Sequence, residues 1–205
     1  MKLWFLTPMN VLYKQLVALH TPDMTPDHTD QALLVMDVQP GIVGRLRDGD
    51  AYVSRVRTAV DSAHARGIPV IYVVVGFRAG APEVSPRNKA FSNAVKQGAA
   101  FGDAQPTIPP GNGDVVVVKR RVSAFTGSDL EVVMRAKGVQ HLVLAGIATS
   151  GVVLSTLREA ADKDYRLTVL SDLCADTDAE VHNVLINKVF PRQAEVVSSA
   201  EWMKG

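Results

Sequence analysis

Residues 141–172, HLVLAGIATSGVVLSTLREAADKDYRLTVLSD, decide the fold of this chain. An apolar strand is expected at 141–146, a helix at 151–164 after a turn, and a second apolar strand at 166–172. Near-continuous apolar runs are typical of strands buried on both faces of a parallel sheet. A helix is the usual connection between two such strands. The stretch therefore predicts one strand–helix–strand unit of a parallel α/β sheet.

The same alternation extends over the rest of the chain from residue 31. We expect four more strands, at 32–37, 69–75, 115–119 and 194–198, and four more helices, at 51–66, 87–97, 129–137 and 179–189. Strands that alternate with helices predict a three-layer α/β/α domain around one parallel sheet. We expect this domain to span residues 30–205. Residues 1–29 are expected to form an N-terminal extension and linker, with a short amphipathic helix at 11–19.

Composition excludes several classes of protein. The chain has 205 residues, of which 47% are hydrophobic and 21% charged, as is ordinary for a globular domain. The 22 Lys and Arg residues nearly balance the 21 Asp and Glu residues, so the basic excess of a nucleic-acid binder is missing. The sequence has no apolar run long enough to span a membrane. The single cysteine cannot form an internal disulfide, which favours a reducing, cytoplasmic location. The apolar start of the chain argues only weakly for a signal peptide, because Pro8, Asn10 and Lys14 interrupt it.

Two charged residues stand where predicted strands end. Asp37 follows the apolar residues 32–36, and Lys119 follows four valines. Ligands of open parallel sheets bind beyond the carboxyl ends of the strands. A carboxylate and an amine at that edge can shift each other's proton affinity and perform acid–base work. The alternative is a capping carboxylate and a solvated strand-end lysine.

The turn Gly146-Ile-Ala-Thr-Ser-Gly151 is a second candidate element. Backbone N–H groups at the start of a helix can hold an oxyanion or a carboxylate. The turn is not G-x-G-x-x-G, and the first strand is not followed by a glycine-rich turn, so we expect neither a dinucleotide nor another cofactor. The five histidines are scattered, so we expect no metal. The long connection 76–113 is expected to be either a surface excursion or a wall over the site.

Three segments resemble the isochorismatase-like hydrolase superfamily, in the order found there. They are LLVMDVQ at 33–39, VVVKRRVSAFTGSDL at 116–130 and the stretch 142–172. The resemblance implies a Rossmann-like, six-stranded parallel sheet of order 3-2-1-4-5-6, which brings Asp37 beside the turn at 146–152. It also implies a cis peptide bond at Ile147–Ala148 and assembly into homo-oligomers.

Most members of that superfamily resemble cysteine hydrolases with an Asp–Lys–Cys triad. Asp37 and Lys119 match the first two residues, whereas the cysteine position is occupied by Val152. Isochorismatases also lack the cysteine, and they cleave a vinyl ether with the aspartate as general acid. We therefore expect hydrolysis of a small polar or anionic metabolite by Asp37 and Lys119, without a thiol nucleophile. The alternatives are a catalytically silent ligand-binding member, and an amidohydrolase that uses another nucleophile such as Ser150 or Cys174.

Further residues are expected to contact the substrate. Gln39 and Phe125 are candidates for the pocket lining, and Thr149 for holding the turn. Arg78 and Arg87 are candidates for bidentate binding of a substrate carboxylate. The remaining candidates belong to the turn itself: Ile147, Ala148 and Gly151.

Overall fold

Six parallel strands form one sheet with the order β3-β2-β1-β4-β5-β6. The computed structural model describes residues 30–96 and 104–205, so the helix and linker predicted before residue 30 lie outside the described residues. The strands are β1 (Gln31–Met36), β2 (Val70–Val75), β3 (Val115–Lys119), β4 (His141–Ile147), β5 (Arg166–Ala175) and β6 (Glu195–Val197). The predicted fold class and strand order are confirmed.

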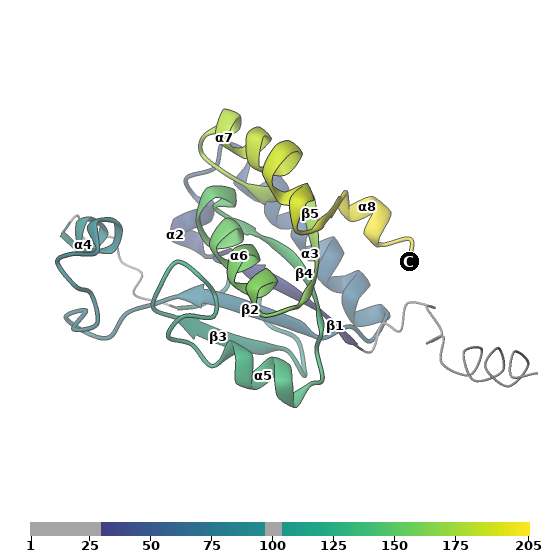
Figure 1. Ribbon diagram of the computed structural model, residues 1–205, viewed down its shortest axis with the longest axis horizontal. Helices are drawn as coiled ribbons and strands as arrows, with labels where there is room; N and C mark the ends of the chain where they lie inside the picture. The colour runs from purple at the N-terminus through teal and green to yellow at the C-terminus, as the bar shows by residue number, and fades with distance from the viewer. Residues whose placement is uncertain (1–29, 97–103) are drawn as a thin grey trace, which may run out of the picture.

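Helices cover both faces of this sheet (Figure 1). On one face, α5 (Leu130–Ala136), α6 (Leu154–Asp162) and the π-helical turn η3 (Leu185–Val189) pack over the strands. On the other face lie α2 (Pro40–Val43), α3 (Gly49–Ala65) and α8 (Ser199–Trp202). Because both faces of the sheet are covered, all six residues of β1 and of β2 are buried. This explains why the sequence reads as apolar runs rather than as alternating residues.

Most predicted elements lie within a few residues of the observed ones, and the differences are local. The π-helical turn η2 (Thr149–Val153) precedes α6, and α7 (Ala179–Val184) ends where η3 begins. The strand predicted at 166–172 continues to Ala175, and its pairing with β4 shifts register between Leu144 and Gly146. The connection 76–113 contains α4 (Lys89–Lys96). Near the end of the chain, the short turn η4 (Phe190–Arg192) follows η3.

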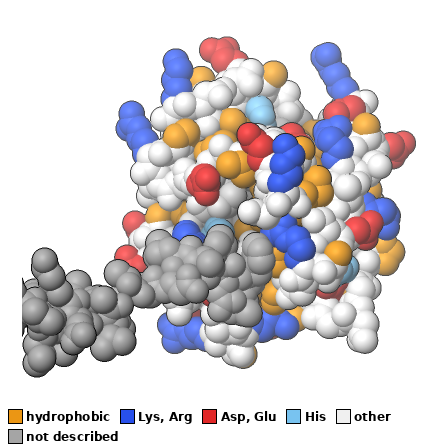
Figure 2. All heavy atoms as spheres, turned by 90° about the vertical axis from the view of Figure 1, so that its right-hand side faces the viewer, with side chains coloured by type: hydrophobic (Ala, Val, Ile, Leu, Met, Phe, Trp, Pro, Cys, Tyr) orange, Lys and Arg blue, Asp and Glu red, His pale blue; other side chains and the backbone are white. Residues whose placement is uncertain are grey.

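The carboxyl ends and the amino ends of the strands differ in what surrounds them. In Figure 1 the carboxyl ends of the strands point towards α2 and α4, whereas the start of β1 and the C-terminus lie at the opposite side. Figure 2 views that opposite side, where Lys and Arg are interspersed with Asp and Glu. Within residues 30–96 and 104–205, no helix combines the length and apolar character needed to cross a membrane.

Candidate active site

The strand order reverses between β1 and β4, which lie side by side in the centre of the sheet. β1 pairs with β2 on one side, and β4 pairs with β5 on the other. The chain therefore leaves the carboxyl ends of β1 and β4 in opposite directions, which opens a crevice in such folds. Asp37 directly follows β1, and the turn beginning at Ile147–Ala148 directly follows β4. The sheet topology thus brings together two segments that are more than a hundred positions apart in the sequence.

Asp37 and Lys119 form a buried ion pair at this edge. The Lys119 Nζ atom lies 3.0 Å from Asp37 Oδ2, and their side chains are 2% and 9% exposed. Lys119 Nζ also donates a hydrogen bond to the carbonyl oxygen of Arg121, at 2.9 Å. The predicted pairing of the carboxylate with the amine is therefore present in the structure.

The environment of Asp37 favours proton exchange near neutral pH. Burial raises the pKa of this carboxyl group from 3.8 to about 6, although the charge of Lys119 and its hydrogen bond act in the opposite direction. Its backbone has a φ of 56°, a left-handed conformation that is uncommon for a residue with a side chain. Asp37 Oδ1 is buried and has no hydrogen-bond partner among the described residues. One oxygen of the carboxyl group is therefore left for a ligand.

Gln39 is buried behind Asp37 and bonds to the end of β2. Its Nε2 donates to the carbonyl oxygen of Val75 at 3.1 Å, and its Oε1 accepts from the Val75 N–H at 2.8 Å. Both polar ends of the amide are thus used by the backbone. Gln39 ties the segment after β1 to the neighbouring strand, and this is a positioning role instead of the predicted substrate contact.

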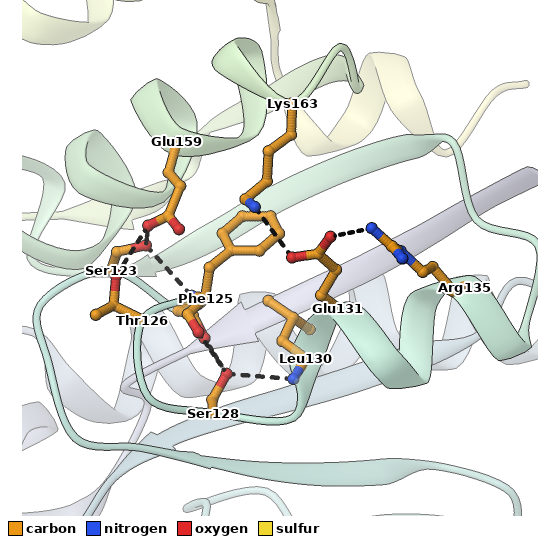
Figure 3. Close-up of polar contacts among 10 residues, drawn as sticks. Ser123, Phe125, Thr126, Ser128, Leu130, Glu131, Arg135, Glu159 and Lys163 are labelled. Atoms are coloured by element: carbon orange, nitrogen blue, oxygen red, sulfur yellow. Dashed lines mark hydrogen bonds and ion pairs between the residues drawn. The ribbon is translucent and has the colours of Figure 1, made fainter.

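The segment after Lys119 is tied to α6 by hydroxyl groups (Figure 3). Ser123 Oγ and Thr126 Oγ1 both donate to Glu159 Oε2, at 2.6 and 3.2 Å. Phe125, between them in the chain, lies beneath Lys163, whose Nζ is 5.5 Å from the ring centroid. Phe125 therefore packs into the core against α6 and does not reach the site. Its predicted role in substrate binding has no support from this position.

The turn after β4 requires a glycine at its start. A Cβ atom on Gly146 would lie 2.4 Å from the carbonyl oxygen of Met36, so no larger residue fits beside β1. The peptide bond Ile147–Ala148 is cis, as the family resemblance implies. The Ser150 N–H donates to Asp176 Oδ2 at 2.8 Å, and the Gly151 N–H donates to the carbonyl oxygen of Ala148 at 3.0 Å. Two N–H groups of the predicted anion cradle are therefore already used within the protein.

A cavity of about 240 Å³ contains the ion pair, and we call it the Asp37 cavity. Its lining includes Ile147, Ala148, Gly151 and Val152 from the turn. Phe91 of α4 also lines it, so the connection 76–113 does supply part of a wall. The lining residues that the sequence did not indicate are Ile42, Arg45, Val75, Val122 and Thr177. The cavity is smaller than the ~300–1,000 Å³ typical of sites for drug-sized ligands, so it fits a small molecule.

Three other predicted contacts lie away from this cavity. Arg78 pairs with Glu83 at 3.3 Å and lines a separate hollow beside β3. Arg87 is exposed on the segment before α4. Thr149 is fully buried, and its hydroxyl lies 2.8 Å from His182 Nδ1. The Thr149 hydroxyl thus links the turn to α7, and Thr149 is not among the residues that line the Asp37 cavity.

The two alternative nucleophiles also lie outside it. Cys174 is buried on β5, and burial raises the pKa of its thiol to about 12. A thiol with that pKa stays protonated near neutral pH, and only the thiolate is a good nucleophile. Ser150 is exposed and is absent from the cavity lining. The described residues contain no group of three or more His, Cys, Asp or Glu side chains that could hold a metal ion.

A parallel α/β sheet with a buried carboxylate–amine pair at the carboxyl ends of its strands belongs to the class of folds that bind small molecules there, and comparison with known proteins identifies the family. The family model described as the isochorismatase domain matches residues 31–201. The uncharacterized isochorismatase family protein YecD of Escherichia coli O157:H7 is 34% identical over 181 residues, covering 83% of this chain and 93% of that protein. The chain therefore belongs to the isochorismatase family of hydrolases.

Solved structures share the fold. A cysteine hydrolase from Pseudomonas syringae pv. phaseolicola superposes with a TM-score of 0.76 at 23% identity, covering 87% of this chain and 92% of that one. An N-carbamoylsarcosine amidase from Thermoplasma acidophilum superposes with a TM-score of 0.66 at 26% identity, covering 83% and 96%. The family thus includes relatives named as amidases as well as isochorismatase-like proteins.

Proposed function

We propose that this protein hydrolyses a small polar or anionic metabolite through Asp37 and Lys119, without a cysteine nucleophile. The observation that carries the proposal is the 3.0 Å ion pair in a cavity whose wall includes Val152. The family resemblance assigns the nucleophile position to Val152, and an isopropyl group cannot attack a substrate. The chemistry must then depend on proton transfer and electrostatic stabilisation.

Cleavage of a vinyl ether fits these requirements. The protonated Asp37 carboxyl group gives its proton to the terminal enol carbon, and the ether oxygen stabilises the resulting oxocarbenium ion. Water adds to this cation and loses a proton to the Asp37 carboxylate. The hemiketal then collapses to pyruvate and an alcohol. Lys119 holds the carboxylate form of Asp37 in place, and the pKa of about 6 keeps both protonation states accessible near neutral pH.

The direct test is pyruvate release from isochorismate by the wild-type protein and by Asp37→Asn. Asp61→Asn, an exposed residue of α3, is the matched control. We expect release by the wild type and the control, with at least a hundredfold loss of kcat/KM in Asp37→Asn. Release that survives in Asp37→Asn would exclude Asp37 as the acid. If the wild type releases no pyruvate, isochorismate is not its substrate.

Amide hydrolysis is the second candidate, and it is favoured by the likeness to a protein named as an N-carbamoylsarcosine amidase. Ammonia release from a panel of small amides and N-carbamoyl compounds tests it. Activity that disappears on Ser150→Ala or Cys174→Ser, but not on Asp61→Asn, would identify a displaced nucleophile. Ligand binding without turnover of isochorismate or of any compound in the amide panel would instead identify a catalytically silent member of the family.

A further inference from the structure

Among the described residues, one charged residue that lines the Asp37 cavity has no ion-pair partner. Asp37 and Lys119 neutralise each other at 3.0 Å. Most of the remaining lining is apolar, and it comes from α2, α4, the end of β2 and the turn after β4. The polar exceptions are Thr177 and Arg45, and Arg45, which the sequence did not indicate, is the charged one. A cavity with apolar walls and a single unpaired cation favours a ligand that carries an anionic group.

Arg45 is free to bind such a group. Its side chain is exposed, and within residues 30–96 and 104–205 no carboxylate lies in ion-pair distance of it. Its backbone position is fixed, because the Arg45 N–H donates to the carbonyl oxygen of Ile42 at 3.1 Å, just after α2. The residue before α2 is Gln39, which is bonded to Val75. The guanidinium group therefore extends from an anchored segment of the backbone.

A second cavity meets the first at Arg45. This arginine cavity, of about 460 Å³, shares Arg45 and Thr177 with the Asp37 cavity and is also lined by Arg47 and Arg55. Arg55 pairs with Asp48 at 3.5 Å. The other carboxylate in its lining, Asp176, accepts hydrogen bonds from the Ser150 and Asp178 N–H groups, and these help to keep the pKa of that carboxyl group low. Three arginines against two engaged carboxylates give the arginine cavity a positive potential, which attracts anions.

The inner end of the Asp37 cavity indicates which chemical group of a ligand would contact Asp37. Asp37 Oδ1 is buried without a partner, while Oδ2 pairs with Lys119. An unpartnered buried carboxylate oxygen is costly unless a ligand supplies a hydrogen-bond donor or takes a proton. The two polar ends of the cavity thus carry different chemistry, with a proton-exchanging group inside and a fixed cation at the mouth.

We propose that Arg45 binds the anionic group of the substrate at the mouth of the Asp37 cavity, and that the substrate is a small anion whose reactive bond lies at Asp37. This inference rests on the proposed function, because it assigns the substrate class of the same site. Arg45 is the specificity-determining residue, and it takes the role that the sequence analysis gave to Arg78 and Arg87. The planar guanidinium group suits a carboxylate because it can donate two parallel hydrogen bonds.

Calorimetric titration with benzoate and benzamide tests this assignment, since the two probes share an apolar ring and differ in charge. We expect the wild type to bind benzoate, and Arg45→Ala to weaken benzoate binding at least tenfold while changing benzamide binding less than twofold. Arg45→Lys keeps the charge but loses the fork, so an intermediate loss is expected. Arg87→Ala is the matched control and should bind both probes as the wild type does.

Three results would overturn the proposal: no benzoate binding by the wild type, an equal loss of both probes in Arg45→Ala, or a loss in Arg87→Ala as large as that in Arg45→Ala. Asp37→Asn separates this proposal from the proposed function. That variant keeps Arg45 and should still prefer the anionic probe, although it should lose turnover. Charge preference that depends on Arg45, together with turnover that does not depend on Asp37, would refute the proposed function alone. Turnover that depends on Asp37, together with a charge preference that does not depend on Arg45, would refute only the assignment of Arg45.

Discussion

Asp37 combines three features that seldom occur in one residue. It is buried, it pairs with a buried lysine, and its backbone is left-handed. The first feature raises the pKa of the carboxyl group and the second opposes that rise, so the balance of burial and charge sets proton exchange near pH 6. Unfavourable backbone conformations cost about 1–3 kcal/mol and persist where the surrounding structure holds them. Here Gln39 and the Asp37 N–H, which donates to the carbonyl oxygen of Val73 at 2.7 Å, do so.

The pH dependence of stability should report this carboxyl group directly. Its pKa is raised in the folded state, so its contribution to the free energy of unfolding is full below about pH 4 and is lost as the pH rises through about 6. Asp37→Asn removes this dependence. Between pH 4 and 7, we expect the difference in unfolding free energy between the variant and the wild type to change by about 2 kcal/mol in favour of the variant. Urea unfolding at several pH values measures it, and parallel pH profiles would contradict the assignment.

The pH dependence of activity should follow the titration of the Asp37 carboxyl group. If Asp37 is the general acid, kcat/KM falls as the pH rises above about 6, because the carboxyl group must be protonated to act. A profile that instead rises through pH 6 would assign Asp37 as a base.

The single cysteine should be chemically silent in the folded protein. Cys174 is buried, and burial raises the pKa of its thiol to about 12. We expect alkylation by iodoacetamide at pH 8 to be at least a hundredfold slower in the native protein than in urea, because only the thiolate reacts. Mass spectrometry over time measures it. Rapid native alkylation would return Cys174 to the list of candidate nucleophiles.

At the scale of elements, the site depends on how the ends of strands are anchored. The segment after β1 is bonded to β2 through Gln39, and the segment after β3 is bonded to α6 through Glu159. In the second case one carboxylate oxygen accepts from two hydroxyl groups, as Figure 3 shows. The backbone that accepts a hydrogen bond from Lys119 therefore continues into a segment fixed on a helix.

Glu159→Ala should loosen this segment. Hydrogen bonds to a charged group contribute about 1.5–3 kcal/mol each, and partial exposure reduces this, so we expect a loss of about 1–2 kcal/mol in unfolding free energy. Amide hydrogen exchange at residues 121–126 should accelerate at the same time. Asp162→Ala, an exposed residue at the end of the same helix, is the control and should stay within about 0.5 kcal/mol of the wild type. Unchanged exchange in Glu159→Ala would show that packing alone holds the segment.

The helices and strands, and the pairing of Asp37 with Lys119, could be predicted because their signals are local. Buried parallel strands give apolar runs, and a charge at the end of such a run marks the carboxyl edge, which found Asp37 and Lys119. Arg45 gave no such signal. It lies on a short segment after the four-residue helix α2, and only the fold brings it to the cavity. Gln39 and Phe125 follow the right strands, but sequence spacing does not reveal that one amide bonds to β2 and the ring packs under Lys163.

At the scale of the whole molecule, the sheet separates stability from the candidate chemistry. The Asp37 cavity lies at the carboxyl ends of the strands, whereas α8 closes the core near their amino ends. There the Arg66 guanidinium lies 4.5 Å from the Trp202 ring centroid and donates to the Trp202 carbonyl oxygen at 2.7 Å. Ser199 adds two 2.6 Å hydrogen bonds to the Asp172 carboxylate. The last helix is thus fastened to the domain by packing, charge and hydrogen bonds together.

Trp202→Ala should therefore destabilise the protein without altering the site. Removing a buried tryptophan side chain costs about 3 kcal/mol, and for a domain of this size that lowers Tm by roughly 6–12 °C. Trp202→Phe keeps an aromatic ring and should lose less than half as much. Benzoate affinity, measured well below Tm, should match the wild type in both variants. A change in affinity as large as that of Arg45→Ala would show that the packing of α8 is coupled to the Asp37 cavity.

The Asp37 cavity and Gly205 lie at opposite ends of the strands, and this has a practical consequence for experiments on immobilised protein. Gln31 at the start of β1 and Gly205 both line the same hollow, at the edge opposite the Asp37 cavity. A biotin group or a sensor-chip linker attached at Gly205 would orient the protein with its cavity towards the solution. Immobilised protein should then bind small ligands with the same affinity as free protein, which makes fragment screening on a chip a direct route to the substrate.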